Sequence, residues 1–428
     1  MIARLHSYWY ALRASYWFYP ALFALCSVLL GTLTVELDHT DLLARFVEDG
    51  WLRPMHASDA SDLLGVATGS MLGVAGTVFS ITIAAVAYAS GNYGPRLLTN
   101  FMEDKGNQLS LATFIGTFVY GLTVMRAMRG GGGEDEAFVP QISLLVAFAF
   151  LIVTTAVLVY FLHHIPASIR IDTVLEAIGR RLLRQIATRY PEEGSRDPAR
   201  RATPRGEAIC AQETGYVRVI ELDTLCEVAA RHDRLVNLAV RTGDFVYPGV
   251  VLAHTDARRL DGSFAGEVRA TMALGASRTA EQDIEFSMDE LVEIALRALS
   301  PGINDPFTAI TALHWIGAAT ADFGRRDLAF ETWNTGDPAC PVARLHSDFA
   351  HFLQRGFVAM RSAVATSRLA ALMALESLHT ASQQVTSAHR RRLLLEEMDR
   401  LAEQAAEHLS GPDIALVRER HALLRGEG

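Results

Sequence analysis

Charged residues are absent from four long stretches in the N-terminal part of the chain. No Asp, Glu, Lys or Arg lies between Arg13 and Glu36, between Asp62 and Arg96, between Lys105 and Arg126, or between Glu136 and Arg170. Each stretch holds about 20 residues or more, and a helix of that length, rising about 1.5 Å per residue, crosses the ~30 Å hydrocarbon core of a bilayer. The pattern predicts four transmembrane helices, near Trp17–Val35, Leu63–Ala89, Leu109–Met125 and Ile142–Leu162.

The chain beyond Arg170 has no comparable stretch. Its longest uncharged run, Pro306–Ala321, is shorter and contains His314 and several threonines. This run is typical of a buried helix in a soluble domain rather than a membrane span. We therefore expect a four-helix transmembrane domain over residues 1–164 and no span after it.

The distribution of arginines predicts the orientation. The N-terminal segment carries Arg4 and Arg13 without an acid, and five arginines follow the fourth span, whereas the first connecting loop is mostly acidic. Arg126 and Arg129 go against this trend. Because cytoplasmic loops carry the excess of Lys and Arg, we expect both termini to be cytoplasmic.

The second span has one face of small residues. Gly65, Gly69, Gly73, Gly76, Ser80 and Ala84 fall on one side of a helix with 3.6 residues per turn. Small residues let helices approach closely in lipid, so the face indicates tight packing within the bundle or between subunits of a homo-oligomer. The alternative is that copies of this face surround a pore.

No span carries an acidic residue, a histidine or an arginine in its middle. Ion-coupled transporters usually need such a residue as a relay or counter-ion. The pattern therefore favours a passive channel or a structural anchor over a coupled pump.

Residues 165–205 are predicted to form a basic helix, ending near Arg189, and a linker rich in Pro, Gly and charge. The arginines of this helix are expected to face anionic lipid headgroups at the cytoplasmic side of the bilayer.

Residues 206–279 have the composition of a small β-rich domain. Strands are predicted at Tyr216–Glu221, Arg234–Val240 and Val250–His254, and a short helix at Thr224–Arg231. The phrase GDFVYPGVVL is similar to the turns of barrel-sandwich hybrid domains, which include biotinyl and lipoyl carriers. Lys105 is the only lysine in the chain, so no prosthetic group could be attached here. The domain is expected to be structural or ligand-sensing.

Residues 280–428 are predicted to be helical. A capping box from Ser287 to Glu290 is expected to open one helix, and Asp305-Pro306 to open the next as N-cap and first residue. The turn between them comprises Ser300, Pro301, Gly302, Asn304, Asp305 and Pro306. It could be a rigid turn held by Asn304 and Asp305, or it could direct backbone N–H groups at an anion.

Composition excludes several classes of protein. The four cysteines are far apart and form no CxxC pair, which argues against a zinc ribbon, a redox dithiol and a disulfide framework. The net charge of -9 gives no support to nucleic-acid binding. No catalytic constellation, metal site or cofactor site is evident, and the acidic residues Asp283, Glu285, Asp289 and Glu290 are expected to form a solvated face or caps.

Three phrases carry a resemblance to a known family. RTAEQDIEFSMDELVEIALRALSPGINDPFTAI, PRLLTNFMEDKGNQLSLATFIGTFVYGL and GDFVYPGVVL resemble a bacterial family of predicted membrane proteins, domain of unknown function 2254. The resemblance implies a protein of the bacterial inner membrane with four N-terminal helices and a cytoplasmic C-terminal domain. It implies no activity, substrate or catalytic residue.

Two functional hypotheses follow. The first is an oligomeric, channel-like protein, with the small-residue face of the second span at the pore or the subunit interface and the cytoplasmic half as gate or sensor. The second is a membrane-anchored sensing or interaction module that conducts nothing. An enzyme is the third choice, because no nucleophile, base or metal spacing is visible.

Overall fold

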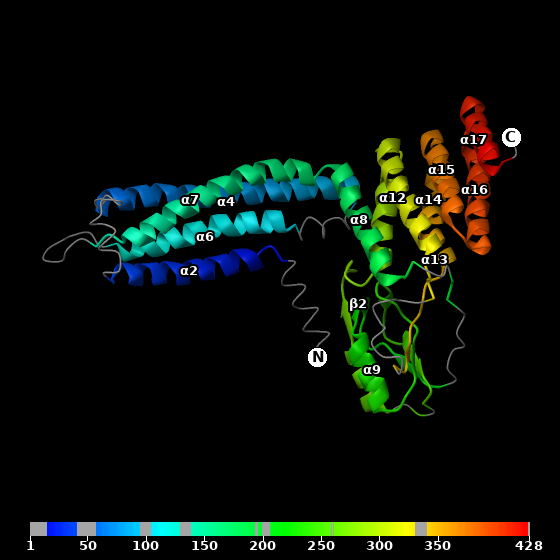
Figure 1. Cartoon of the computed structure of the whole chain (residues 1–428), viewed down its shortest axis with the longest axis horizontal. Coiled ribbons are helices and arrows are strands. Elements are labelled where there is room, and N and C mark those ends of the chain that lie inside the picture. Colours follow the sequence, from blue (N-terminus) through cyan, green and yellow to red (C-terminus); the bar gives the residue numbers. More distant parts are fainter. Residues whose placement is uncertain are drawn as a thin grey trace. The chain divides into compact units, whose positions relative to one another are not determined.

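The computed structural model describes residues 15–40, 57–94, 104–128, 138–192, 196–198, 206–257, 259, 261–329 and 340–426. The chain divides between Arg170 and Ile171 into two compact units, called here the four-helix unit and the C-terminal unit. The protein is mostly helical, with four membrane-length helices in the first unit and a small mixed α/β region in the second (Figure 1).

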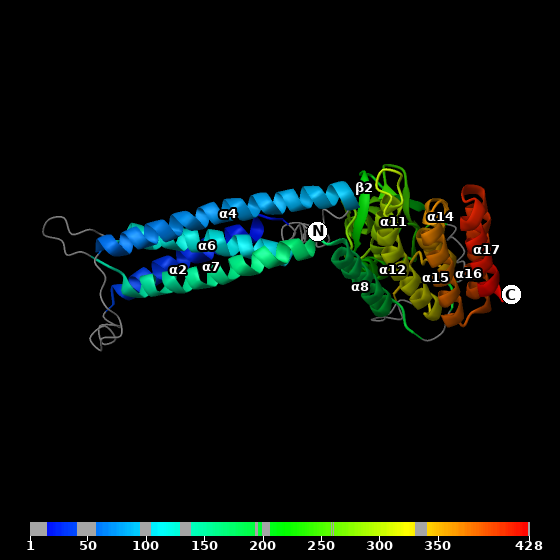
Figure 2. The same ribbon diagram turned by 90° about the horizontal axis from the view of Figure 1, so that it is seen from above.

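The four-helix unit consists of α2 (Phe18–Asp38), α4 (Ala57–Tyr93), α6 (Lys105–Ala127) and α7 (Gln141–Ser168). All four are long and apolar enough to cross a membrane, which confirms the spans predicted from the charge gaps. The helices lie side by side, and α6 packs against each of the other three (Figures 1 and 2).

Glycines set the close approaches around α6. A Cβ atom added at Gly121 of α6 would overlap Thr68 of α4, and one added at Gly31 of α2 would press on Thr123 of α6. These glycines lie outside the small-residue face predicted on the second span. Close contact in this bundle therefore depends on Gly31 and Gly121.

Several buried polar groups inside the bundle are paired across helices. The hydroxyl of Tyr120 lies 2.9 Å from that of Thr34 and donates to the carbonyl of Ser143 at 3.1 Å. The Asp38 carboxylate accepts from the backbone N–H groups of Ile142 (2.7 Å) and Ser143 (3.0 Å), and so caps α7. Hydrocarbon offers no alternative partner, so these bonds satisfy polar groups that would otherwise be costly.

The helix predicted to run from Ile165 to Arg189 is divided in two. α7 continues to Ser168, and α8 (Ile171–Arg189) begins after Ile169 and Arg170. Pro166 lies inside the last turn of α7. It lacks the N–H that would bond the preceding turn, which weakens the helix at this point.

The β-rich part of the C-terminal unit holds two small sheets around a common apolar core. One sheet has the order β1-β5-β3-β7 and the other β4-β2-β6. The strands are β1 (Ala208–Cys210), β2 (Gly215–Ile220), β3 (Val236–Leu238), β4 (Phe245–Val246), β5 (Val251–Thr255), β6 (Met272–Gly275) and β7 (Val342–Ala343), with helices α9 (Leu222–Arg231) and α10 (Gly262–Ala270). The three predicted strands correspond to β2, β3 and β5.

Strand β7 comes from a distant part of the chain. It pairs in parallel with β3, whereas every other pairing is antiparallel among the described residues. Next to it, Cys340 forms a disulfide with Cys226 of α9, 114 residues away in sequence. The expectation that the cysteines form no disulfide framework missed this bond, because sequence separation does not fix spatial distance.

The remaining helices form the other part of the C-terminal unit. They are α11 (Ile284–Ala298), α12 (Pro306–Arg325), α13 (Phe349–Leu353), the π-helix η4 (Gln354–Val358), α14 (Ala359–Val364), α15 (Arg368–Gln384), α16 (Ala388–His408) and α17 (Gly411–Arg425). Among them α12 occupies a central place, packed against α8, α11 and α15. Much of the predicted linker, residues 193–195 and 199–205, lies outside the described residues.

Candidate functional site

The small-residue face of α4 is open within the four-helix unit. Gly69, Gly73, Gly76, Ser80 and Ala84 are exposed, and Gly65 is half-buried. A Cβ atom added at Gly69, Gly73 or Gly76 would meet no described atom within 4 Å. The opposite face of α4 packs into the bundle through residues such as Ala75 and Val78. From Gly69 onward, the predicted face is therefore not used for packing within the described bundle.

The hydroxyl groups along this open face are satisfied by their own helix. Ser80 donates to the carbonyl of Gly76 at 2.9 Å, and Thr77 to that of Gly73 at 3.0 Å. Such back-bonding lets a hydroxyl lie in an apolar environment without a second partner. The face is thus compatible with either lipid, a second helix or a pore lumen.

The turn between α11 and α12 is held by its own hydrogen bonds. The N–H of Asn304 donates to the carbonyl of Ser300 at 2.9 Å, and Asn304 takes a left-handed φ of 50°. The Asp305 carboxylate accepts from the backbone N–H groups of Phe307 (3.1 Å) and Thr308 (3.2 Å). Pro306 then opens α12, as the sequence predicts. Because Asp305 occupies the N–H groups that an anion would need, the arrangement is that of a rigid turn.

The acidic residues predicted to form a solvated face are instead gathered in a buried charge cluster. Asp283, Glu285 and Glu290 are buried, with exposed fractions of 2%, 8% and 1%. Asp283 pairs with Arg278 at 2.6 Å, and Arg278 also contacts Asp289. The alternative of helix caps holds for Asp283, which is the N-cap of α11. The prediction of a solvated face was wrong, because Glu285 and Glu290 are paired with the distant residues Arg355 and Arg181, which local sequence does not reveal.

Partners from three other helices complete the charge cluster. The π-helix η4 places Arg355 3.2 Å from Glu285 and 2.8 Å from Asp289. His351 bonds Glu285 at 2.8 Å, and Arg181 of α8 contacts Glu290. The cluster therefore ties α8, α11 and the α13–η4 segment together. Arg181 accordingly points into the unit and not toward lipid headgroups.

Burial and pairing shift the pKa values of two carboxyl groups of the cluster in opposite directions. Burial raises the pKa of Asp283 to about 6, although the Arg278 guanidinium opposes the shift. Burial also acts to raise the pKa of Glu285, but the hydrogen bond from His351 and the charge of Arg355 outweigh it and lower the pKa to about 2. Asp283 also caps α11, by accepting from the N–H of Phe286 at 3.1 Å.

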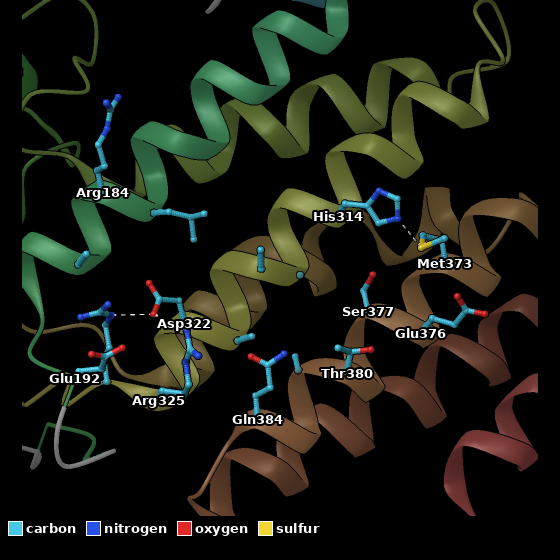
Figure 3. A pocket seen from close by; sticks show the side chains of 17 residues that line it. Arg184, Glu192, His314, Asp322, Arg325, Met373, Glu376, Ser377, Thr380 and Gln384 are labelled. Carbon is cyan, nitrogen blue, oxygen red and sulfur yellow. Dashed lines mark hydrogen bonds and ion pairs between the residues drawn. The ribbon is translucent and has the colours of Figure 1, made fainter.

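A groove of about 820 Å³ lies on the C-terminal unit between α8 and α15, with α12 as its floor (Figure 3). Small residues of α12, among them Gly317, Ala318 and Ala321, make the floor low. Leu183 of α8 and Met373 of α15 supply apolar walls. The groove can hold an elongated ligand with an apolar body.

Polar groups also line this groove along its length (Figure 3). Asp322 is already neutralised by Arg326 at 3.0 Å and Arg325 at 3.1 Å. Glu376 pairs with Arg420 at 3.0 Å. The exposed side chain of Arg184 forms no ion pair with any described residue. Arg184 is therefore the cation most available to an anionic group of a ligand.

Nothing in the described part of the chain resembles a metal centre, since no group of three or more His, Cys, Asp and Glu side chains converges there. The sequence could identify the small-residue face and the turn. It could not identify the groove, which joins residues of three helices, or the charge cluster, which draws on Arg181 and Arg355.

Comparison with known proteins places these features in a family. Uncharacterized proteins of Mycobacterium bovis and Mycobacterium tuberculosis are each 35% identical to the chain over 282 residues, which is 63% of this chain and 53% of the relative. The chain thus spans about half the length of the curated relatives it matches. No solved structure matches. The family described as "Predicted membrane protein (DUF2254)" matches residues 13–380, and the chain belongs to this family.

Proposed function

We propose that the protein is an oligomeric, channel-like protein of the bacterial inner membrane, in which the small-residue face of α4 forms the pore or the subunit interface. The observation that carries the proposal is the openness of this face: Gly69, Gly73 and Gly76 have space beside them that no described residue fills. In lipid, such a face permits a second backbone to approach closely. The C-terminal unit is then the gate or sensor.

The chemistry of the spans favours passive conduction. No acidic residue, histidine or arginine lies in the middle of a span. A pore lined by glycine, alanine and internally bonded hydroxyls can gate by dewetting and needs no coupling ion. This composition supports a channel in preference to an ion-coupled transporter.

Oligomeric state and conductance test this proposal together. Full-length protein in lipid nanodiscs is expected to form a defined oligomer by mass photometry and to conduct in planar bilayers. Gly69→Leu and Gly73→Leu fill the open face, so both should weaken assembly and alter conductance. Ile152→Leu, which changes a 72% exposed apolar residue of α7, is the matched control and should change neither. A monomeric wild-type protein with a silent bilayer would refute the proposal.

The orientation forms part of the same proposal. Both termini are placed in the cytoplasm, and the exposed arginines of α8, Arg180 and Arg184, contact anionic headgroups. A green fluorescent protein fused behind Gly428 should fluoresce, whereas alkaline phosphatase at the same position should be inactive. The reverse result would invert the topology.

A second candidate function is a membrane-anchored sensing module without conduction. The groove between α8 and α15 favours it, because it has an apolar floor and an exposed Arg184 that forms no ion pair with the described residues, and these features suit a ligand. The two small sheets then form a barrel-sandwich-like structural or ligand-sensing domain. Two results together would support this second function. The protein would be a monomer that conducts nothing, and Ala318→Trp in the groove would change its unfolding temperature, whereas a substitution at an exposed control position would not.

A further inference from the structure

The turn between α11 and α12 displays apolar side chains on a rigid frame. The N–H of Ile303 donates to the carbonyl of Ser300 at 3.1 Å, and that of Asp305 to the carbonyl of Ala298 at 2.8 Å. Ile303 is nevertheless 42% exposed and Phe307 is 70% exposed. The backbone polar groups of this turn are hydrogen-bonded within the turn, whereas its apolar side chains are exposed. The turn therefore has the properties of a contact surface.

Helix register places this turn beside the beginning of α8. Arg181 of α8 contacts Glu290 of α11, and Arg189 donates to the carbonyl of Gln282, so the two helices run in opposite directions. The first turn of α8 is therefore level with the end of α11.

The register of α12 gives the same position. Gly179 of α8 lies against Trp315, and Arg326 donates to the carbonyl of Tyr190, so α8 and α12 run in the same direction. Counting back along both helices brings Ile171 level with Phe307. Packed helices lie about 8–10 Å apart, so Phe307 is about one helix diameter from the start of α8.

The start of α8 is tied closely to a membrane helix by the chain itself. α7 ends at Ser168, and only Ile169 and Arg170 precede α8. Three peptide steps span at most about 11 Å. The chain therefore holds Ile171, which is level with Phe307 in the C-terminal unit, within about 11 Å of the last residue of α7.

We propose that Ile303 and Phe307 insert into the interfacial zone of the lipid bilayer and dock the C-terminal unit on the membrane surface. Aromatic and aliphatic side chains gain free energy in this zone, where apolar acyl chains begin. The rigid turn supports insertion, because few backbone conformations are lost when the side chains enter lipid. This proposal depends on α7 as a membrane span but not on conduction or on oligomer formation.

Photo-cross-linking in the full chain tests this docking. p-Benzoylphenylalanine replaces Phe307, and the purified protein is irradiated in nanodiscs of phosphatidylcholine and phosphatidylglycerol. The intact mass is expected to rise by the mass of one lipid. The matched control carries the same group at Leu423, which is 62% exposed near the end of α17, and should form no lipid adduct.

A cross-link from position 307 to a second copy of the chain, or to another protein, would overturn the proposal, as would an unmodified mass. If the Phe307 variant does not fold, a second variant replaces it. This variant carries a nitroxide label on Ile303→Cys, and its free cysteines Cys26 and Cys210 are changed to Ser. Lipid contact then predicts greater relaxation by oxygen than by a water-soluble nickel chelate. Equal or reversed accessibility would exclude insertion.

Discussion

Arg390 is a completely buried cation whose partners come from several parts of the C-terminal unit. Its guanidinium donates to both carboxylate oxygens of Asp197, at 3.0 and 2.9 Å. It also donates to the carbonyls of Phe323 (3.1 Å), Gly324 (3.2 Å), Arg326 (2.8 Å) and Arg196 (2.6 Å). One side chain thus donates hydrogen bonds to the carbonyl groups at the C-terminal end of α12. Within the described residues, no other side chain caps this end of the helix.

Replacement of Arg390 should therefore strongly destabilise the folded protein. Arg390→Met removes the buried cation that pairs with the Asp197 carboxylate and the donor that several carbonyls share, so we expect the free energy of unfolding to fall by about 3–5 kcal/mol. Denaturant unfolding of the purified protein measures the change. Arg392→Met, an exposed neighbour on the same helix, should change it by less than about 0.5 kcal/mol. Similar values for both variants would contradict this role of Arg390.

Because of the Asp283 carboxyl group, we expect the free energy of unfolding to decline with rising pH. Its pKa is raised to about 6 from 3.8 in the unfolded chain, so between these values the folded protein holds a proton that the unfolded chain has lost. Stability from this group is therefore greatest below about pH 4 and decreases until about pH 6. Glu285, with its pKa lowered to about 2, acts in the opposite sense only below about pH 4.5.

Thermal unfolding between pH 4.5 and 7 separates these two carboxyl groups. Asp283→Asn should remove the decline up to pH 6, because the amide does not titrate. Asp348→Asn, at the N-cap of α13, should keep the decline. An unchanged pH profile in the Asp283 variant would show that its titration does not govern stability in this range.

These residues also show what sequence could and could not reveal. Asp305 and Pro306 start α12 as predicted, because both signals act within one turn of helix. The capping box predicted at Ser287 and Glu290 was wrong, since α11 already begins at Ile284, capped by Asp283. Ser287 and Glu290 bond Gln185 and Arg181 of α8 instead. No local pattern encodes those distant partners.

At the scale of elements, helices α8 and α12 approach each other closely at a glycine. A Cβ atom added at Gly179 would overlap the indole ring of Trp315. The approach of these two helices forms one side of the groove in Figure 3, so the glycine also affects the shape of that site.

Gly179→Ala is consequently expected to destabilise the protein by about 1–3 kcal/mol through overpacking, although alanine favours helix by about 1 kcal/mol. Gly266→Ala in α10 provides the matched control, because its added Cβ would meet no described atom within 4 Å. That variant should be neutral or slightly more stable. Both changes are measured by denaturant unfolding, and equal stabilisation would show that α8 and α12 can separate at no cost.

Elements differ in how far the sequence predicts them. The membrane helices follow from charge gaps alone, because lipid imposes one strict requirement on every residue of a span. Helix α9 and strands β2, β3 and β5 were also found. Strand β7 was missed, because its two residues acquire strand geometry only by pairing with β3, about a hundred residues earlier.

At the scale of the whole molecule, the Cys226–Cys340 bond joins the sheet region to the segment that leads into the last helices. Closing a loop of this size restricts the unfolded chain and is worth about 2–5 kcal/mol. In Cys226→Ser/Cys340→Ser, the free energy of unfolding should fall by that amount and become insensitive to reductant. The variant Cys26→Ser/Cys210→Ser, which changes the two free cysteines, should keep the wild-type response. A wild-type protein indifferent to reductant would contradict the prediction.

The unequal lengths of the membrane helices have a final consequence. The helix that forms the candidate span has 34 residues in α4 and 21 in α2, which correspond to about 51 Å and about 32 Å of helix. Of these two helices, α2 matches a hydrocarbon core of ~30 Å and α4 exceeds it. α4 must tilt or project into water, and both adjustments depend on acyl-chain length. The inclination of α4, and with it the surface that its glycines present, should therefore vary with the thickness of the surrounding bilayer.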